Sequence, residues 1–559
     1  MSTPKTSFEV QVLEDKHWVI AEMAGDEDKA KAFAENLLQT GNHAAVRVVK
    51  DYQRIDGTHT ETVLLEKQAA SKGPGDPTLA SITEAPLCAA LEDFYGQPSR
   101  TTIGRLLRKY LDEALISPTE LLHDAKEMKR FGDKGNLLFG AIDKVSALQA
   151  KAAGDENGKA RKDFLDKSWE QLLARAKEFT TKKPKTPQTF AEAVGAAGGD
   201  AFTLRALLSM ALLEKRSWFG KLDMLIAWAA EPAAQMPVID GIISDLMVPA
   251  QVIQDLLGFQ SNLSSALCQI VTLTEGKAEA AKFAPQTFVE LNKLFAEGRL
   301  PQTREVLLAR VVREVGGVNP LSRNDPAQEY EMFHKMLHRL VDRDAVTGGP
   351  PLAESLLQRG SRVLNAGGAT VSAPQALQLL LGTLADGCVR LQFLLTLCAS
   401  SLGKSMGEVL TEVLDNHVRR SAHIDQWVAV RLSPPARMAA LTAANKALRS
   451  CPVLADEFKK SLAELIDDVM VRYLTEEGVI EKIDKPDDPL AARAVRLVKF
   501  CGAGVLIEGK SLNMAKARVI EHLRQKQFEE KFVASCPDPS QGDKSLREFH
   551  KLLVECGFG

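Results

Sequence analysis

The chain has 559 residues, of which 45% are hydrophobic, 26% are charged and only 6% are aromatic. This length exceeds what one hydrophobic core normally supports, so we expect several packing units, and the apolar content excludes a largely disordered protein. The chain contains 70 basic and 73 acidic residues, so its formal net charge is only −3. The chain as a whole therefore has no basic field that would attract nucleic acid or anionic lipid.

The first 68 residues predict a small α+β module with the element order ββαββ. Short segments there alternate between apolar and polar residues, the period of a half-buried strand. Asp26 is a suitable cap for a helix in which Ala30, Phe33 and Leu37 share one face. The predicted strands are residues 7–12, 18–21, 45–49 and 62–65, with a turn around Asp56 and Gly57 joining the last two.

Residues 69–78 predict a flexible linker, because this stretch combines two glycines with two prolines. Almost all of the remaining chain has helical spacing, and Ser117-Pro118-Thr119-Glu120 is a capping box that predicts a helix starting at residue 118. We found no fixed repeat of 20 to 50 residues. The body is therefore expected to be an irregular helical bundle or a degenerate α-solenoid. Breaks divide it into helical units 79–181, 188–350 and 351–559, with a second linker at 182–187.

The eight cysteines are scattered without a CxxC pair, which predicts reduced, buried thiols and neither a zinc site nor a disulfide framework. The N-terminus lacks the apolar core of a signal peptide, and the longest uncharged runs are too polar for a membrane span. We therefore expect a cytoplasmic protein without a membrane partner.

One string matches a nucleotide-binding motif. Residues 504–511, from Gly504 to Lys510 and Ser511, satisfy G-x-x-x-x-G-K-[ST], in which backbone amides cradle phosphates and the lysine reaches them. However, the variable positions are mostly bulky and include Glu508, and the segment before them, 489–500, has helical rather than strand spacing. The preferred interpretation is a loop between two helices.

Two histidine pairs are candidates for chemistry. His334 and His338, with Asp342 four residues further, have the i, i+4, i+8 spacing of one helix face, on which they would share a metal ion. A partly exposed polar face explains the same residues. His417 and His423 lie six residues apart and do not share a helix face, so a phosphotransfer role is not supported.

Three basic stretches are candidates for nucleic-acid binding: residues 182–185, residues 419–420, and a C-terminal helix with Lys516, Arg518, Arg524 and Lys526. Acidic residues interleave with the last, as on a solvated face, so nucleic-acid binding is not expected. The apolar C-terminal tail, from Phe528 to Phe558, is expected to dock on its own domain, or to support assembly of a homo-oligomer.

The pattern as a whole favours a non-enzymatic, cytosolic interaction, scaffold or regulatory protein. Its helical body would be the main binding surface for a protein partner, and the N-terminal module a second recognition element. No catalytic, cofactor-binding or metal-binding residue is assigned, and no cofactor is expected. The alternative is an enzyme or ligand sensor with a site between helical units, for which Gly504–Ser511 or the pair of His334 and His338 are the places to look.

Overall fold

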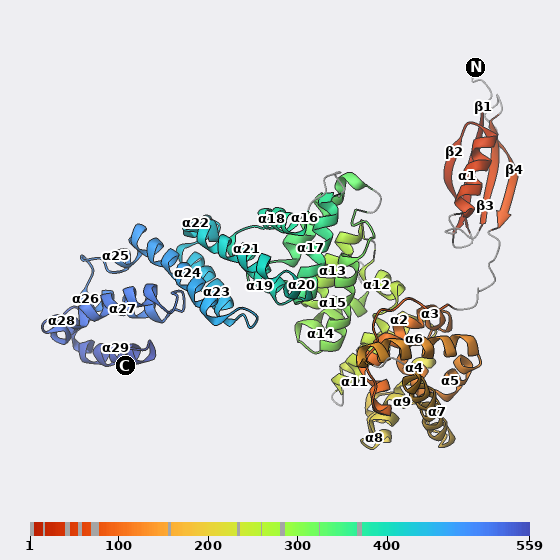
Figure 1. Cartoon of the computed structure of the whole chain (residues 1–559), viewed down its shortest axis with the longest axis horizontal. Coiled ribbons are helices and arrows are strands. Elements are labelled where there is room, and N and C mark those ends of the chain that lie inside the picture. Colours follow the sequence, from red (N-terminus) through yellow and green to blue (C-terminus); the bar gives the residue numbers. More distant parts are fainter. Residues whose placement is uncertain are drawn as a thin grey trace. The chain divides into compact units, whose positions relative to one another are not determined.

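The structure is a computed structural model, and it confirms a mainly α-helical fold with a small N-terminal α+β module (Figure 1). It describes residues 5–14, 17–39, 45–53, 59–68, 78–154, 158–231, 235–258, 260–279, 285–322, 325–365 and 372–558. The chain forms two compact units. One comprises Met1–Ser81 with Phe139–Ala141, and the other comprises Ile82–Leu138 with Ile142–Gly559.

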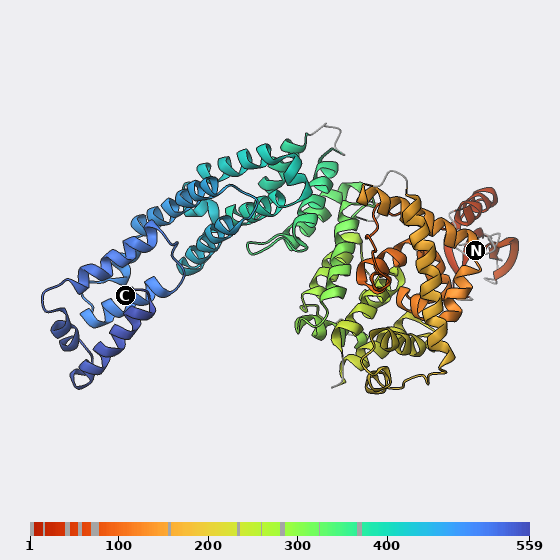
Figure 2. The same ribbon diagram turned by 60° about the horizontal axis from the view of Figure 1, so that its bottom comes forward.

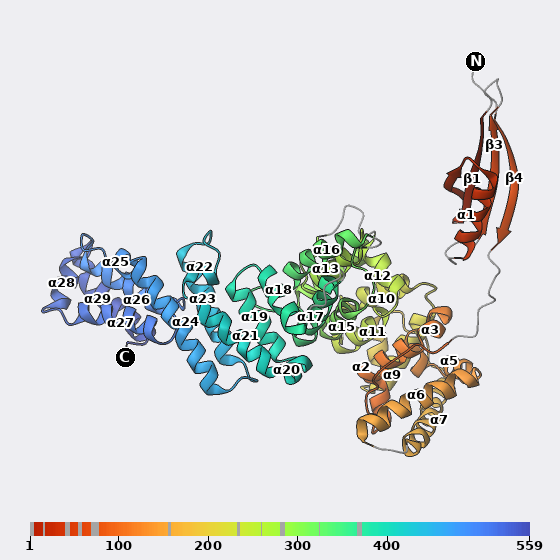
Figure 3. The ribbon, with the colours of Figure 1, turned by 45° about the horizontal axis from the view of Figure 1, so that its top comes forward.

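The first unit is a four-stranded antiparallel sheet with one helix on one face (Figures 1 and 3). Its elements are β1 (Lys5–Glu14), β2 (His17–Ala24), α1 (Glu27–Gln39), β3 (Ala45–Gln53) and β4 (His59–Gln68), in the sheet order β2-β1-β3-β4. Val10 lies opposite Val48 in the register of β1 and β3, and both side chains pack with Ala30 and Ala34 of α1. Asp26 caps α1 as predicted, because its Oδ1 accepts hydrogen bonds from the amides of residues 28 and 29.

The second unit consists of helices. Its first half contains α2 (Gln97–Leu106), α3 (Arg108–Ala114), α4 (Pro118–His123), α5 (Ala125–Gly132), α6 (Gly135–Ala153), α7 (Lys159–Thr181), α8 (Phe190–Ala197), α9 (Ala201–Leu213), α10 (Trp218–Ala229), α11 (Met236–Leu246), α12 (Ala250–Leu257), α13 (Leu263–Thr274), α14 (Gln286–Ala296) and α15 (Pro301–Gly316). Its second half contains α16 (Glu329–Leu340), α17 (Gly349–Asn365), α18 (Ala373–Thr383), α19 (Gly387–Cys398), α20 (Ser401–Ser405), α21 (Gly407–Arg420), α22 (Ile424–Trp427), α23 (Pro434–Ser450), α24 (Asp456–Glu476), α25 (Val479–Ile483), α26 (Leu490–Gly502), α27 (Lys510–Leu523), α28 (Phe528–Ala534) and α29 (Gly542–Glu555). Short 3-10 turns lie at Leu91–Tyr95, Pro326–Gln328 and Pro539–Gln541.

The two halves pack differently. In the first, helices distant in sequence meet: α2 and α4 both contact α11, and α4 also contacts α9. From α15 onward, each helix makes its main contacts with helices at most four positions away in the order, such as α19 with α23 and α24 with α27 (Figure 2). The first half is thus a bundle, whereas the second has the neighbour-only packing of an α-solenoid, without a sequence repeat.

Buried polar contacts hold the bundle together. Lys221 of α10 places Nζ 2.5 Å from Oε1 of Glu120 in α4 and donates to the Leu115 carbonyl at 2.6 Å, and both charged side chains are 0% exposed. The other carboxylate oxygen of Glu120 accepts from the amide of Ser117, which completes the predicted capping box. Burial raises the pKa of Glu120, and Lys221 opposes that shift.

A second buried carboxylate organises the C-terminal helices. Asp484, 1% exposed at the end of α25, accepts hydrogen bonds from Arg493 at 2.7 Å, Arg518 at 2.6 Å and His522 at 2.8 Å. These donors come from α26 and α27. One side chain therefore ties three helices together by charge-assisted hydrogen bonds.

The predicted linkers and unit boundaries lie partly within the described residues. The predicted first linker, residues 69–78, lies outside the described residues apart from Thr78, and so does the turn at Asp56 and Gly57. Residues 182–187 connect α7 to α8, and the proposed boundary at 350/351 falls in the first turn of α17. Among the described residues, no single helix combines the length and apolar character of a membrane span. Helices α11 and α12 meet those criteria only as a pair bent by 99°.

Candidate binding groove

A groove of about 1050 Å³ lies between α18, α21 and α22. One face of α21 forms its longest wall, since the residues of α21 that line the groove recur at helical spacing along almost the whole helix. Leu410, Leu414 and Val418 on the other face are buried. The lining residues are Pro374, Gln378, Leu381, Gly382, Ala385, Asp386, Arg390, Val409, Glu412, Val413, Asn416, His417, Arg420, Ser421, Asp425, Gln426 and Ala429.

The charges of the groove are only partly neutralised within the protein. Asp386 pairs with Arg343 at 2.5 Å, and Asp425 pairs with Arg437. Two other basic side chains of the lining have no carboxylate partner among the described residues: Arg420, and Arg390, which donates only a long hydrogen bond of 3.4 Å to a backbone carbonyl. Among its described residues, the groove therefore retains two guanidinium groups without a carboxylate partner, and one unpaired carboxylate, that of Glu412.

His417 has a structural position in the groove wall. Its Nε2 lies 2.9 Å from the carbonyl oxygen of Gly387, and its ring lies 5.2 Å from that of the fully buried Trp427. The carbonyl can only accept, so Nε2 carries the proton of this hydrogen bond. Burial lowers the pKa of His417, and nearby Arg390 acts in the same direction. The imidazole is therefore neutral at neutral pH and joins α21 to α19 and α22.

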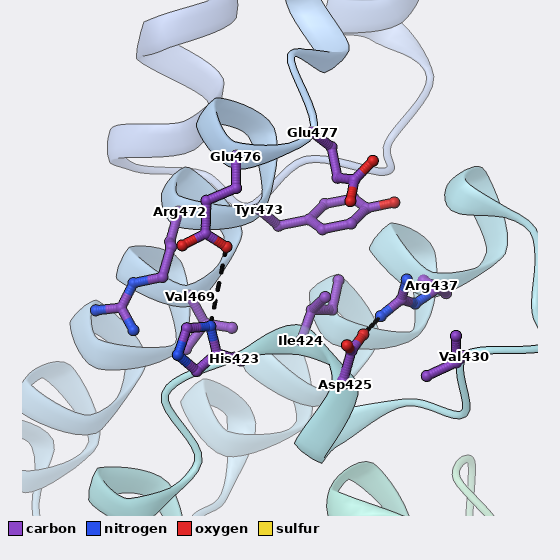
Figure 4. Close-up of a pocket in the computed structure, with 10 residues that line it drawn as sticks. All are labelled: His423, Ile424, Asp425, Val430, Arg437, Val469, Arg472, Tyr473, Glu476 and Glu477. Atoms are coloured by element: carbon purple, nitrogen blue, oxygen red, sulfur yellow. Dashed lines mark hydrogen bonds and ion pairs between the residues drawn. The ribbon is translucent and has the colours of Figure 1, made fainter.

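A smaller pocket of about 180 Å³ adjoins the groove through Asp425, which lines both (Figure 4). Its walls come from α22, α23 and α24, and its charged groups mostly face one another. His423 Nδ1 lies 3.9 Å from Glu476, Asp425 pairs with Arg437, and that guanidinium lies 5.2 Å from the centre of the Tyr473 ring. His417 and His423 thus line different hollows, in agreement with the expectation that they do not share a face.

In the structure, residues 504–509 form a loop between α26 and α27, and Lys510 and Ser511 are the first two residues of α27. Two of the backbone amides that would cradle a phosphate are occupied: those of Lys510 and Ser511 donate to the carboxylate of Asp467 in α24 at 2.5 and 3.1 Å. The Lys510 ammonium lies 2.6 Å from Asp468. A protein carboxylate therefore occupies the place that a phosphate takes in a nucleotide-binding loop.

His334 and His338 do lie together on α16, with their Nε2 atoms 3.1 Å apart and their ring centres 4.3 Å apart. The expectation that Asp342 shares their face is wrong, because α16 ends at Leu340. Asp342 instead accepts hydrogen bonds from the amides of residues 344 and 345 in the following turn. Among the described residues, no three histidine, cysteine or carboxylate side chains come together as a metal site.

Much of the basic surface considered for nucleic acid is used internally. Arg419 pairs with Asp415, and Lys182 pairs with Glu178. Arg518 binds Asp484 and Glu521, whereas Lys516 donates to the carbonyl of residue 557.

The apolar tail docks on its own domain as expected: Phe528, Phe532 and Phe549 are buried together, and α28 and α29 both contact α26.

The N-terminal unit presents an ordered polar row on the sheet face opposite α1. Gln11 and Arg47 are register partners one residue away from the pair Val10 and Val48, so their side chains lie on the other face. Arg47 Nε donates to Gln11 at 2.7 Å, and its guanidinium lies 4.5 Å from the centre of the Trp18 ring. Such a planar aromatic and guanidinium surface suits recognition of a partner.

Sequence reasoning did not find the groove, because its walls are helices separated by turns whose folding is not visible in local spacing. One signal was available. The outward face of α21 carries Val409 and Val413 beside charged residues, an apolar content that a purely solvated face does not need. Comparison of the chain with family models, with curated proteins and with solved structures gives no match.

Proposed function

We propose that this protein is a non-enzymatic interaction, scaffold or regulatory protein that binds a protein partner through its helical body. The observation that carries the proposal is the groove along α21. Its volume of about 1050 Å³ is just above the roughly 300 to 1000 Å³ of small-molecule sites. Its lining mixes apolar side chains with charged ones, as protein interfaces do, rather than being predominantly apolar.

The N-terminal unit is proposed as a second recognition element. The row formed by Trp18, Arg47 and Gln11 lies on the sheet face opposite α1, where Trp18 and Arg47 are partly exposed and Gln11 is buried. Tryptophan and arginine are residue types that are enriched at binding sites. Two weak contacts on one chain raise the overall affinity without any new interaction, provided that both can be engaged at once.

Affinity capture from the source cells tests the proposal when exposed groove residues are altered. Gln378 and Gln426 are exposed on the lining, so Gln378→Trp and Gln426→Trp should fill the groove without disturbing the core. Lys551→Trp, on an exposed position of α29, is the steric control. We expect the two groove variants to lose a stoichiometric partner that the control retains. Retention of every partner by both groove variants would remove the groove from the proposal.

An enzyme or ligand sensor remains the second candidate, and one observation supports it. The two Nε2 atoms of His334 and His338, 3.1 Å apart, have the separation of two nitrogens that are each about 2.1 Å from one metal ion. Elemental analysis of the purified protein and of His334→Ala tests this candidate. Near-stoichiometric zinc, copper or nickel that the variant lacks would support it, and a folded, metal-free protein would contradict it.

A further inference from the structure

We propose that the groove binds an amphipathic helix of about three turns from a partner protein, with the acidic end of that helix over Arg390 and Arg420. This inference rests on the proposed function and specifies the chemistry of the partner. It follows from the length of the groove, from the arrangement of its two walls and from the charges that the protein itself leaves unpaired.

The length comes from α21. The lining of this wall runs from Val409 to Arg420, which corresponds to about 16 Å, or three helical turns, at about 1.5 Å per residue. The opposite wall is a face of α18, where Pro374, Gln378 and Leu381 recur at helical spacing. A groove between two helix faces can accept a third helix, which is the geometry of helix-in-groove recognition.

The two ends of α21 differ in character. Val409 and Val413 lie at its beginning, whereas His417 and Arg420 lie at its end. Arg390 belongs to the same end, because it lies one turn after Gly387 in α19, whose carbonyl oxygen is 2.9 Å from Nε2 of His417. Glu412 lies eight residues before Arg420, which places it about 12 Å away along the helix. The groove therefore has a cationic half at the end of α21, and a half at its beginning in which Glu412 lies between the two valines.

Charge complementarity then defines the partner. The lining carboxylates of Asp386 and Asp425 are already paired with Arg343 and Arg437, so they do not neutralise the cationic half. A bound helix should place apolar residues at i, i+3 and i+4 spacing against the valines and carboxylates against the two arginines. Its binding should weaken as salt is added, because Arg420 is exposed and a charge pair formed there is screened.

Site-specific photocrosslinking in the source cells tests the proposal on the full chain. A benzophenone amino acid is placed at Gln378 or Gln426, two exposed lining positions, and at Lys551 as a control outside the groove. The crosslinked segments are identified by mass spectrometry. We expect both groove positions to capture one segment of another protein that has helical apolar spacing and an acidic end.

Charge reversal then separates the inference from the proposed function. Arg420→Glu should reduce that crosslink at least tenfold, whereas Arg524→Glu, an equally exposed reversal outside the groove, should leave it unchanged. Capture of a basic or uncharged segment, capture of a second copy of this chain, or no effect of Arg420→Glu would overturn the inference but not the proposed function. Crosslinks at neither groove position would overturn both.

Discussion

The buried ion pair between Lys221 and Glu120 gives the sharpest test of how the bundle is held together. Lys221→Met removes the cation that contacts the fully buried Glu120, and it leaves the Leu115 carbonyl without the donor that the structure gives it. Breaking a buried pair by removing one partner costs about 3 to 5 kcal/mol, because the remaining charge stays buried and uncompensated. The replacement keeps the apolar length of the lysine stem, so little packing is lost.

Hydrogen exchange in α4 and α10 is the suitable assay, since a chain with two compact units is not expected to unfold in one step. At about 1.4 kcal/mol per tenfold change, the expected loss is two to four orders of magnitude in amide protection. The double variant Lys221→Met with Glu120→Gln is the matched control. It removes the stranded charge and keeps an acceptor for the Ser117 amide, so it should recover much of the protection.

The pH dependence provides a second readout. Burial already raises the pKa of Glu120, and loss of Lys221 removes the interaction that opposes this shift. A carboxyl group whose folded pKa is raised contributes stability below its unfolded pKa of about 4.3 and loses it as the pH rises through the folded value. The penalty of Lys221→Met should therefore be larger at pH 7 than at pH 5. A change in protection below tenfold, or equal penalties at both pH values, would refute this account.

Three further variants test other contacts. Asp467→Ala should leave the first amides of α27 without an acceptor and cost about 1 to 2 kcal/mol of local stability, measured by hydrogen exchange. Asp467→Asn should cost less, because its side-chain oxygen still accepts from these amides. Equal losses in the two variants would contradict this account. Gly387→Ala would place Cβ about 2.6 Å from the Gln426 carbonyl oxygen, so hydrogen exchange in α19 and α22 should show a loss of about 1 to 3 kcal/mol in local stability. Gly382→Ala, with nothing within 4 Å of its Cβ, should cost nothing, and an equal loss in this variant would refute the steric cause. Burial acts to raise the pKa of Asp484, but hydrogen bonds from its three donors lower that pKa overall. Amide protection of the C-terminal helices should therefore be complete above the ordinary aspartate pKa of about 3.9. It should decline as the pH falls through the lowered pKa of Asp484. Asp484→Asn should reduce that protection by about 2 to 3 kcal/mol at pH 7 and flatten the acid decline; a decline unchanged in the variant would contradict the assignment.

Local patterns in the sequence predicted the secondary structure of the N-terminal unit well. Alternation over residues 7–12 marked β1, and Asp26 marked the start of α1. These signals are short-range: a strand needs only alternate apolar side chains, and a helix start needs only one capping oxygen. The capping box at Ser117 was equally reliable for the same reason.

Long-range partners explain what the sequence could not predict. The string ending in Lys510 and Ser511 matched a phosphate-binding motif, yet the group that occupies its amides is Asp467, more than forty residues earlier. Asp342 had the right spacing for the face of His334, but its side chain forms a local turn that competes with the helix. The groove depends on the positions of α18 and α21 relative to each other, which helical periodicity alone does not specify.

The neighbour-only packing from α15 to α29 has a consequence for how this part of the chain acquires its structure. Contacts between segments close in sequence require little loop closure, so this half has a low contact order and should fold fast. Each helix finds its partners soon after it leaves the ribosome, whereas α2 and α4 must wait until α11 has been synthesised. The first helices of this unit therefore complete their packing only after α11 has been translated, whereas the last helices pack one after another as they are translated.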